Sequence, residues 1–311
     1  MLVTTSQVET NLSFAIEIEA EILPKQPLGD RNSQYSSFAA SLRSRNLPAA
    51  TDSDDHPASD YGGCGWWITN DSLIESFPGS TPMKSISPVR NFNDGSWRRE
   101  INVFWSAMSS MFEVKKSTTC GSHIHIAPWG EGFTLQQTKT IAFACCYYEP
   151  YVISLMPQER RDHPSCKRNS RASMRISSLF QAGQMSTIAR VIRGQTSTQS
   201  LIECMQGDTR YVLWNFKPLL GSGTIEFRGG RHLRGPNRTT AWITFVVLFV
   251  MLALKEDLLY KQSTYRTVNN DNAMEVQAFW EEFLSYADEL GVRDDLPREF
   301  KMMSEKKAWS I

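Results

Sequence analysis

Residues 14–21 read Phe14-Ala15-Ile16-Glu17-Ile18-Glu19-Ala20-Glu21. In a β-strand, side chains two positions apart point to the same face of the sheet. The three glutamates therefore share one face, and the isoleucines between them fill the opposite, buried face. This alternation predicts a strand over about 13–22 with carboxylates on one side and core residues on the other.

Two later stretches repeat the pattern with other polar residues. They read Gly121-Ser122-His123-Ile124-His125-Ile126 and Gly223-Thr224-Ile225-Glu226-Phe227-Arg228. By the same spacing, the two histidines share a face, and so do Glu226 and Arg228. Side by side, three such strands predict a sheet with one apolar face and one face dense in metal and phosphate ligands. We expect that second face to be the floor of an active site.

Composition sets the broad class. The chain has 311 residues, with 33 basic and 33 acidic side chains. The basic residues are scattered, so nothing indicates a nucleic-acid partner. We expect a single domain over 1–311, with a mobile insert at about 25–62, which includes the acidic loop 51–60, and a helical C-terminal part at about 238–311. The oligomeric state stays open.

The longest apolar run indicates a core helix. It extends from Ala241 to Leu254, fourteen residues, whereas a membrane span needs about 20. The N-terminus lacks the features of a signal peptide. The six cysteines show no paired spacing, which is typical of small core residues in a reduced protein. We therefore expect a cytoplasmic protein with no membrane partner.

The periodicity of apolar residues indicates an α+β fold, in which helices pack on one face of an antiparallel or mixed sheet. Helices are predicted at about 36–45, 94–114, 134–155, 177–193, 238–259 and 274–291. Beyond the strands at 13–22 and around His123, others are predicted at 66–69, 83–89, 210–216 and 224–230.

The acidic face favours a hard metal ion. Alternating acids on an edge strand are also common as solvated surface. However, Glu21 extends the series to three carboxylates, and like charges this close are unfavourable unless a cation lies among them. Oxygen ligands suit Mg²⁺ or Mn²⁺.

The two histidines leave more alternatives open. A His-x-His strand occurs in zinc hydrolases, and it also occurs as a pair of structural histidines. The hydrolase reading needs further histidines, but only His56, His163 and His232 remain, and none lies in a strand with alternating acids. A metal-dependent hydrolase is therefore the weaker alternative.

Glu226 and Arg228 form either an ordinary salt bridge or a functional pair. In the functional reading, Glu226 binds metal while Arg228 neutralises a transferred phosphoryl group. The chain has no P-loop and no kinase signature. Any bound nucleotide must then be held by metal ions and arginines.

The order of the motifs carries a family resemblance. After Glu17-Ile18-Glu19 come the tryptophan strand at 66–69 with Asp71, Ser87-Pro88, the His-x-His strand, Arg210-Tyr211 with Asn215, and Glu226-Phe227-Arg228. Over about Ser13 to Val250 this order resembles the amidoligase family, whose members are similar to glutamine synthetase and glutamate–cysteine ligase. The resemblance implies a glutamine-synthetase-like catalytic sheet.

The resemblance also implies an activity. These enzymes are ATP-dependent carboxylate–amine ligases, in which ATP converts a carboxylate to an acyl phosphate and an amine then displaces phosphate. The implied cofactors are ATP and Mg²⁺ or Mn²⁺, and the implied partners are a small-molecule or amino-acid carboxylate and an amine.

Residue roles follow from the resemblance, position by position. The implied metal ligands are Glu17, Glu19, Asp71, His123 and Glu226. Contacts to nucleotide or substrate are implied for His125, Lys84, Arg210, Asn215 and Arg228. Glu17, Arg210 and Arg228 are the implied catalytic residues. By charge alone, Arg160, Arg171 and Arg175 are candidates to close over the site.

Two departures from the family pattern stand out. The segment Lys84-Ser85-Ile86-Ser87-Pro88 has an amine where the family has a glutamate that is expected to bind metal. Glu21 or Glu75 could substitute, the Lys84 ammonium could replace one metal charge, or the site could bind fewer metals. A catalytically inactive relative that binds nucleotide or a partner is the remaining alternative. The second departure, Ala15 in place of a glycine, is minor.

Overall fold

The computed structural model describes residues 11–54, 63, 65–74, 76–260 and 273–305. Its centre is a mixed sheet of nine strands, in the order β2-β3-β4-β1-β7-β9-β8, with β5 and β6 also paired to β1. The strands are β1 Leu12–Pro24, β2 Ala49–Thr51, β3 Trp66–Thr69, β4 Thr81–Ile86, β5 Arg90–Asn91, β6 Phe112–Val114, β7 Ser122–Pro128, β8 Trp214–Asn215 and β9 Ile225–Gly230. All pairings are antiparallel except that of β2 with β3.

The helices complete an α+β fold, as the sequence predicts. They are α1 Arg31–Arg43, α2 Ser96–Met111, α3 Leu135–Tyr147, α4 Glu149–Leu155, α5 Met174–Gln181, α6 Met185–Arg193, α7 Thr198–Gln206, α8 Pro236–Glu256, α9 Ala273–Glu289 and α10 Lys301–Ser304.

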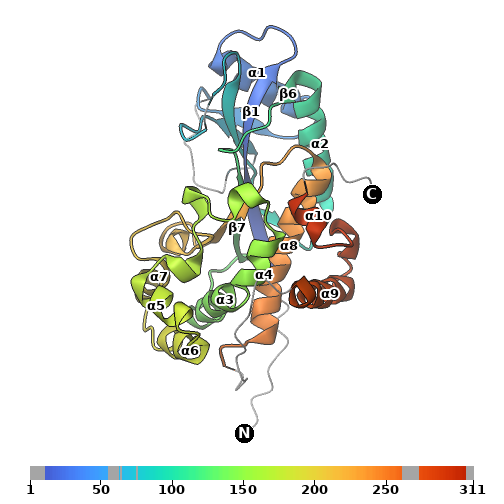
Figure 1. Ribbon diagram of the computed structural model, residues 1–311. Helices are drawn as coiled ribbons and strands as arrows, with labels where there is room; N and C mark the ends of the chain where they lie inside the picture. The colour runs from blue at the N-terminus through green and yellow to red at the C-terminus, as the bar shows by residue number, and fades with distance from the viewer. Residues whose placement is uncertain (1–10, 55–62, 64, 75, 261–272, 306–311) are drawn as a thin grey trace.

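Helices α2 and α8 cover the apolar face of the sheet (Figure 1). On that face Trp66 of β3 stacks on Phe104 of α2, with ring centroids 4.2 Å apart, and Phe227 of β9 stacks on Trp242 of α8 at 5.8 Å. Helix α8 is long and apolar enough to cross a membrane, but 78% of its most apolar window is buried inside the protein. It is a core helix, as expected, and α9 packs on its outer side.

The register of β1 determines which side chains lie together on the opposite face of the sheet. Glu17 pairs with His123 of β7, and Glu19 pairs with Lys84 of β4. His125 of β7 in turn pairs with Glu226 of β9. Residues directly opposite in a ladder point to the same face, so these polar side chains gather on one side. We call this side the ligand face.

Two predicted helices are each divided in the structure. The helix predicted at 134–155 is α3 and α4, which meet at Tyr148. Pro150 lies in the first turn of α4, where its missing N–H costs nothing, whereas it would break a continuous helix. The helix predicted at 177–193 is α5 and α6, separated at Gly183, whose φ of 65° lies in the left-handed region.

Other boundaries differ because side chains cap or pair locally. Helix α1 begins at Arg31 because the Asp30 side chain accepts a hydrogen bond from the Ser33 N–H. Helix α7 is absent from the prediction, although Ser197 begins it with a capping box. The strand predicted at 210–216 reduces to β8, the two residues that pair with β9.

The segment at 25–62 contains defined structure. Helix α1 packs on the core through Phe38, whose ring centroid lies 5.5 Å from that of Phe104, and β2 pairs with β3. Residues 55–62 lie outside the described residues, so the mobility expected for this insert stays a prediction.

We expect Gly230→Ala to destabilise the protein by about 1–3 kcal/mol, because a core without free space resists added atoms. A Cβ at Gly230 would lie 2.5 Å from the Ser122 carbonyl oxygen across the β7–β9 pair. Gly221→Ala is the matched control, since nothing lies within 4 Å of its added Cβ. Urea unfolding of both variants measures the difference, and equal stability would contradict the close approach of the two strands.

Candidate functional site

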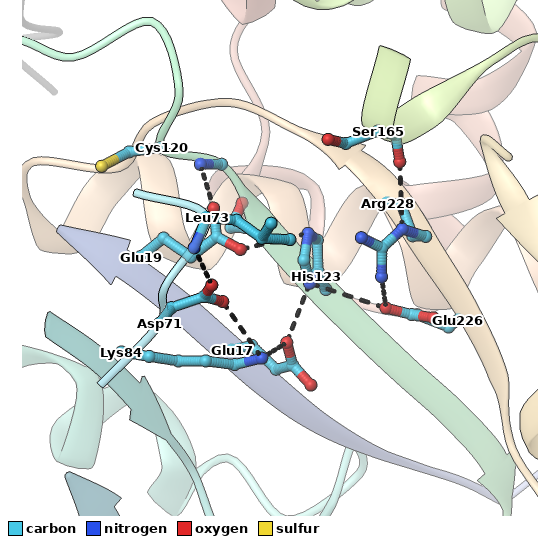
Figure 2. A network of polar contacts seen from close by, with 12 residues as sticks. Glu17, Glu19, Asp71, Leu73, Lys84, Cys120, His123, Ser165, Glu226 and Arg228 are labelled. Atoms are coloured by element: carbon cyan, nitrogen blue, oxygen red, sulfur yellow. Dashed lines mark hydrogen bonds and ion pairs between the residues drawn. The ribbon is translucent and has the colours of Figure 1, made fainter. Parts of the chain in front are cut away.

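The ligand face brings together side chains from four neighbouring strands. Figure 2 shows Glu17 and Glu19 of β1, His123 of β7 and Glu226 with Arg228 of β9 pointing toward one another. Apart from the edge residues Lys84 and Asp71, the clustered side chains are almost fully buried. The three motifs that lie about a hundred residues apart in the sequence therefore form one cluster.

Glu17 lies at the centre of the cluster. Its Oε2 atom is 2.8 Å from His123 Nδ1 and 2.5 Å from Lys84 Nζ, and its Oε1 atom is 3.5 Å from His125 Nε2. Burial by itself would raise the pKa of Glu17. Hydrogen bonds with both histidines and the charge of Lys84 outweigh burial and hold that pKa well below its usual value. Glu17 is therefore a carboxylate at neutral pH.

Glu226 is held from both sides. Asn215 Nδ2 donates to its Oε2 atom at 2.7 Å, and Arg228 Nη1 donates to its Oε1 atom at 2.5 Å. Burial opposes its ionisation, but His123, His125 and Arg228 together keep the pKa of Glu226 below its usual value. Arg228 is oriented in turn because its Nε donates to the Ser165 carbonyl at 3.1 Å.

Three of these residues could hold a metal ion. Glu17, His125 and Glu226 each offer a ligand atom, and the three atoms lie within 4.8 Å of one another. The His125 Nδ1 atom is 2.9 Å from the Thr224 hydroxyl, so its Nε2 atom is the one directed toward the two carboxylates. An outer hydrogen bond of this kind orients metal-binding histidines.

The histidine that is placed to bind a metal ion differs from the one that the resemblance implies. The resemblance implies that His123 binds the metal and that His125 contacts the nucleotide. In the structure His125 is the histidine that converges with Glu17 and Glu226, while His123 is enclosed by carboxylates, 3.5 Å from both Glu19 and Glu226. The role of His123 as a ligand stays a prediction.

Glu19 and Asp71 are the two other acids expected in the cluster. Glu19 Oε2 accepts a hydrogen bond from the Gly121 N–H at 2.7 Å. Asp71 follows β3, and its Oδ2 atom lies 3.8 Å from Lys84 Nζ. Both expected acids are therefore within the cluster, and Lys84 connects Asp71 to it.

Lys84 occupies the place of a cation between Glu17 and Asp71 (Figure 2). Burial by itself would lower the pKa of Lys84. The neighbouring carboxylates of Glu17, Glu19 and Asp71 outweigh burial and raise that pKa above its usual value. The side chain is therefore an ammonium ion that already neutralises part of the acidic cluster.

Glu21, one of the two acids considered as substitutes for the missing glutamate, does not join the cluster. Glu21 is fully buried, and its Oε1 atom accepts hydrogen bonds from the Phe77 N–H and the Ser80 hydroxyl. These local partners hold it away from Glu17. Glu75 lies outside the described residues.

The arginines separate into buried and exposed groups. Arg160 is 2% exposed, and its Nη2 donates to the Arg228 carbonyl at 2.8 Å. Arg210 is exposed and lies over the Tyr211 ring, whose other neighbour is Arg228 at 5.7 Å. Arg171 pairs with Asp162 on the surface, and Arg175 lines an outer cavity of about 680 Å³. Only Arg160 of these four is buried against the cluster.

Gln206 is a supporting residue that sequence reasoning missed. Its Nε2 donates to Asn215 Oδ1 at 2.7 Å, and Asn215 donates to Glu226. Its Oε1 accepts from the Phe216 N–H at 2.7 Å. The signal that could have found it is the capping box at Ser197, which begins α7 and places Gln206 at its end.

We expect Gln206→Leu to lower the free energy of unfolding by about 2 kcal/mol or more, because it leaves the buried Phe216 N–H without its acceptor and removes one of the donors to Asn215 Oδ1. Gln199→Leu is the control, since Gln199 is exposed on the same helix. Thermal unfolding of both variants checks the difference. A Gln206→Leu protein as stable as the control would show that this relay does not support β8.

A family model described as "Putative amidoligase enzyme" matches residues 10–250. The match spans the whole sheet and every residue of the cluster. No curated protein matches the chain.

Proposed function

Because the chain belongs to the amidoligase family, we propose that it is an ATP-dependent carboxylate–amine ligase, which forms an amide bond through an acyl phosphate. The family name supports a ligase that makes amide bonds. The observation that carries the finer proposal is the convergence of Glu17, His125 and Glu226 beside Arg228. Phosphoryl transfer requires charge neutralisation more than covalent assistance, and a carboxylate-held cation beside an arginine supplies it.

The charges of the cluster favour one divalent cation. Glu17, Glu19, Asp71 and Glu226 contribute four negative charges, and Lys84 with Arg228 contributes two positive ones. A histidine that binds metal is neutral, so with neutral imidazoles in the ion-bound site these six side chains leave two negative charges (4 − 2), which one Mg²⁺ or Mn²⁺ balances. Glu17, His125 and Glu226 would hold this ion, and Lys84 would stand in for a second.

The bound ion would neutralise phosphate charge during transfer. In the proposed reaction a substrate carboxylate oxygen bonds to the γ-phosphorus as the bond to ADP breaks. The amine nitrogen then attacks the acyl carbon, the bond from that carbon to the phosphate oxygen breaks, and the phosphate leaves with the proton that the amine gives up. Arg228 is fixed by Glu226 and the Ser165 carbonyl, which supports its proposed role of neutralising the transferred group. His125, Asn215 and Arg210 are proposed on the nucleotide side.

Lys84 also favours a second candidate function, a catalytically inactive relative that binds nucleotide or a partner. Its ammonium lies 2.5 Å from the central carboxylate, a place where a metal charge would serve catalysis. Measurements of ATP binding and turnover distinguish the two functions. ADP release that requires both a carboxylate and an amine supports the ligase, whereas Mg²⁺-ATP binding without turnover across a broad panel of acids and amines supports the inactive relative.

We expect Glu17→Gln and Arg228→Ala each to reduce turnover by about 10²-fold or more, because each removes charge stabilisation from a buried site. Substrate-dependent ADP release is the measurement, and thermal unfolding confirms that the variants fold. Arg190→Ala, an exposed position on α6, is the control and retains activity. Full activity in Glu17→Gln or Arg228→Ala contradicts the assignment of the site.

The cation count provides a separate check. We expect the protein to bind one Mn²⁺ ion per chain, measured by electron paramagnetic resonance titration, and Lys84→Glu to bind two, because the change exchanges an ammonium for a further carboxylate. Lys255→Glu makes the same charge change on the surface, 48% exposed, and keeps one ion. Binding of two Mn²⁺ ions per chain of the unmodified protein would contradict the charge balance of the cluster.

A further inference from the structure

The guanidinium group of Arg228 is held by two hydrogen bonds to the protein. Its Nη1 donates to Glu226 Oε1 at 2.5 Å, and its Nε donates to the Ser165 carbonyl at 3.1 Å (Figure 2). The residue is only 2% exposed. Two of its three side-chain nitrogens are therefore engaged by the protein, in a buried position on the ligand face.

Tyr211 supplies a third contact to the same group. The guanidinium carbon of Arg228 lies over the Tyr211 ring, 5.7 Å from the ring centroid. The face of an aromatic ring carries partial negative charge and attracts a cation within about 6 Å. Guanidinium groups are well suited to this contact because they are planar and weakly hydrated. The ring therefore adds an attraction that the two hydrogen bonds do not supply.

The backbone of Tyr211 is fixed, although the residue is 39% exposed. Its N–H donates to the Thr209 hydroxyl at 3.1 Å, and its carbonyl accepts from the Lys167 N–H at 3.0 Å. Lys167 follows Ser165 by two positions, so one short segment of chain holds both Tyr211 and the Nε atom of Arg228. The ring and the guanidinium group are thus placed by the same part of the fold.

The segment 211–213 also holds the backbone of Arg228. The Leu213 carbonyl accepts from the Arg228 N–H at 2.8 Å, and the Leu213 N–H donates to the Lys167 carbonyl at 2.7 Å. Tyr211 therefore belongs to a segment that is hydrogen-bonded both to β9 and to Lys167. A ring on such a segment is a fixed support for the guanidinium group.

Arg210 lies over the same ring. Its guanidinium carbon is 5.9 Å from the Tyr211 centroid, and the residue is exposed, unlike Arg228. Two positive groups near one another repel, so an electron-rich group that attracts both reduces the cost of gathering them. The Tyr211 ring is a group of this kind.

We infer that Tyr211 is a positioning residue, whose ring holds Arg228 in the orientation set by Glu226 and Ser165 and keeps Arg210 close to it. Positive charge that is already in place stabilises a transition state without reorganisation at the moment of reaction. The effect on turnover rests on the proposed ligase function, because it takes Arg228 to neutralise the transferred phosphoryl group. The effect on Arg228 itself does not depend on that function.

Hydrogen exchange at Arg228 Nε, measured by NMR of the arginine Nε–H groups, tests the contact directly. The Arg228 signal is identified by its loss in Arg228→Lys. We expect Tyr211→Leu to accelerate this exchange by ~10-fold, because an aliphatic side chain lacks the electron-rich face that attracts the cation. Tyr260→Leu is the control, since Tyr260 is 38% exposed and follows α8. Equal exchange rates in the two leucine variants overturn the inference.

Tyr211→Phe separates the effect of the ring from that of the hydroxyl. Among the described residues, none forms a hydrogen bond with the Tyr211 hydroxyl. We therefore expect Tyr211→Phe to exchange as slowly as the unmodified protein, with thermal unfolding as the check that each variant folds. Exchange in Tyr211→Phe as fast as in Tyr211→Leu would show that the ring is not the positioning group.

Turnover with an acid and an amine that support ADP release tests the role in the reaction. We expect Tyr211→Leu to lower kcat by ~10-fold and to change KM for ATP by less than about twofold, because the contact acts on the transition state and not on binding of the ground state. Tyr211→Phe and Tyr260→Leu are expected to keep the kcat of the unmodified protein. A raised KM for ATP with unchanged kcat would show that the ring binds nucleotide, which overturns the inference.

The two measurements keep this inference distinct from the proposed function. If Arg228 exchange depends on Tyr211 but no acid and amine release ADP, the ligase proposal fails while the positioning of Arg228 stands. If ADP release is observed and neither kcat nor Arg228 exchange changes in Tyr211→Leu, the positioning inference fails while the ligase stands.

Discussion

The charge of Glu17 is the constraint on which the rest of the structure depends. A buried carboxylate is costly unless it is paired and hydrogen-bonded. Here its partners come from both neighbouring strands, because His123 and His125 lie on β7 and Lys84 lies on β4. The register of β1 therefore also determines which charged and polar groups surround Glu17. A slip of one residue would turn the glutamates toward α2 and α8 and leave them unpaired.

This arrangement is a poor way to gain stability. Replacing a buried charged cluster by well-packed apolar residues is often neutral or stabilising. The apolar face of the same strands has that packing, with stacked tryptophan and phenylalanine rings. A cluster of four acids and two cations on the other face is consistent with a role in binding a ligand. In the proposed function, Lys84 reduces the negative charge that a metal ion would balance, so this departure from the family pattern bears on the number of ions proposed for the site.

Much of the ligand face was predictable because a strand has a period of two. Alternation in Glu17-Ile18-Glu19, His123-Ile124-His125 and Glu226-Phe227-Arg228 determines which side chains share a face, and the structure confirms the resulting α+β sheet. Helix boundaries were less predictable where capping residues or prolines decide them, as at Asp30 and Pro150. The isolated strand pattern also overestimated β8, because pairing with β9 is limited to two residues.

The sequence by itself determined the faces of the strands, the residue types on the ligand face and the family. Only the tertiary structure decided which of these groups meet. It directs His125 toward Glu17 and Glu226, leaves Arg210 exposed, and connects Gln206 through Asn215 to Glu226. It also brings Ser117 to His232 across 115 positions of the chain. Such contacts depend on strand order and register, which follow from the packing of the whole chain and not from local periodicity.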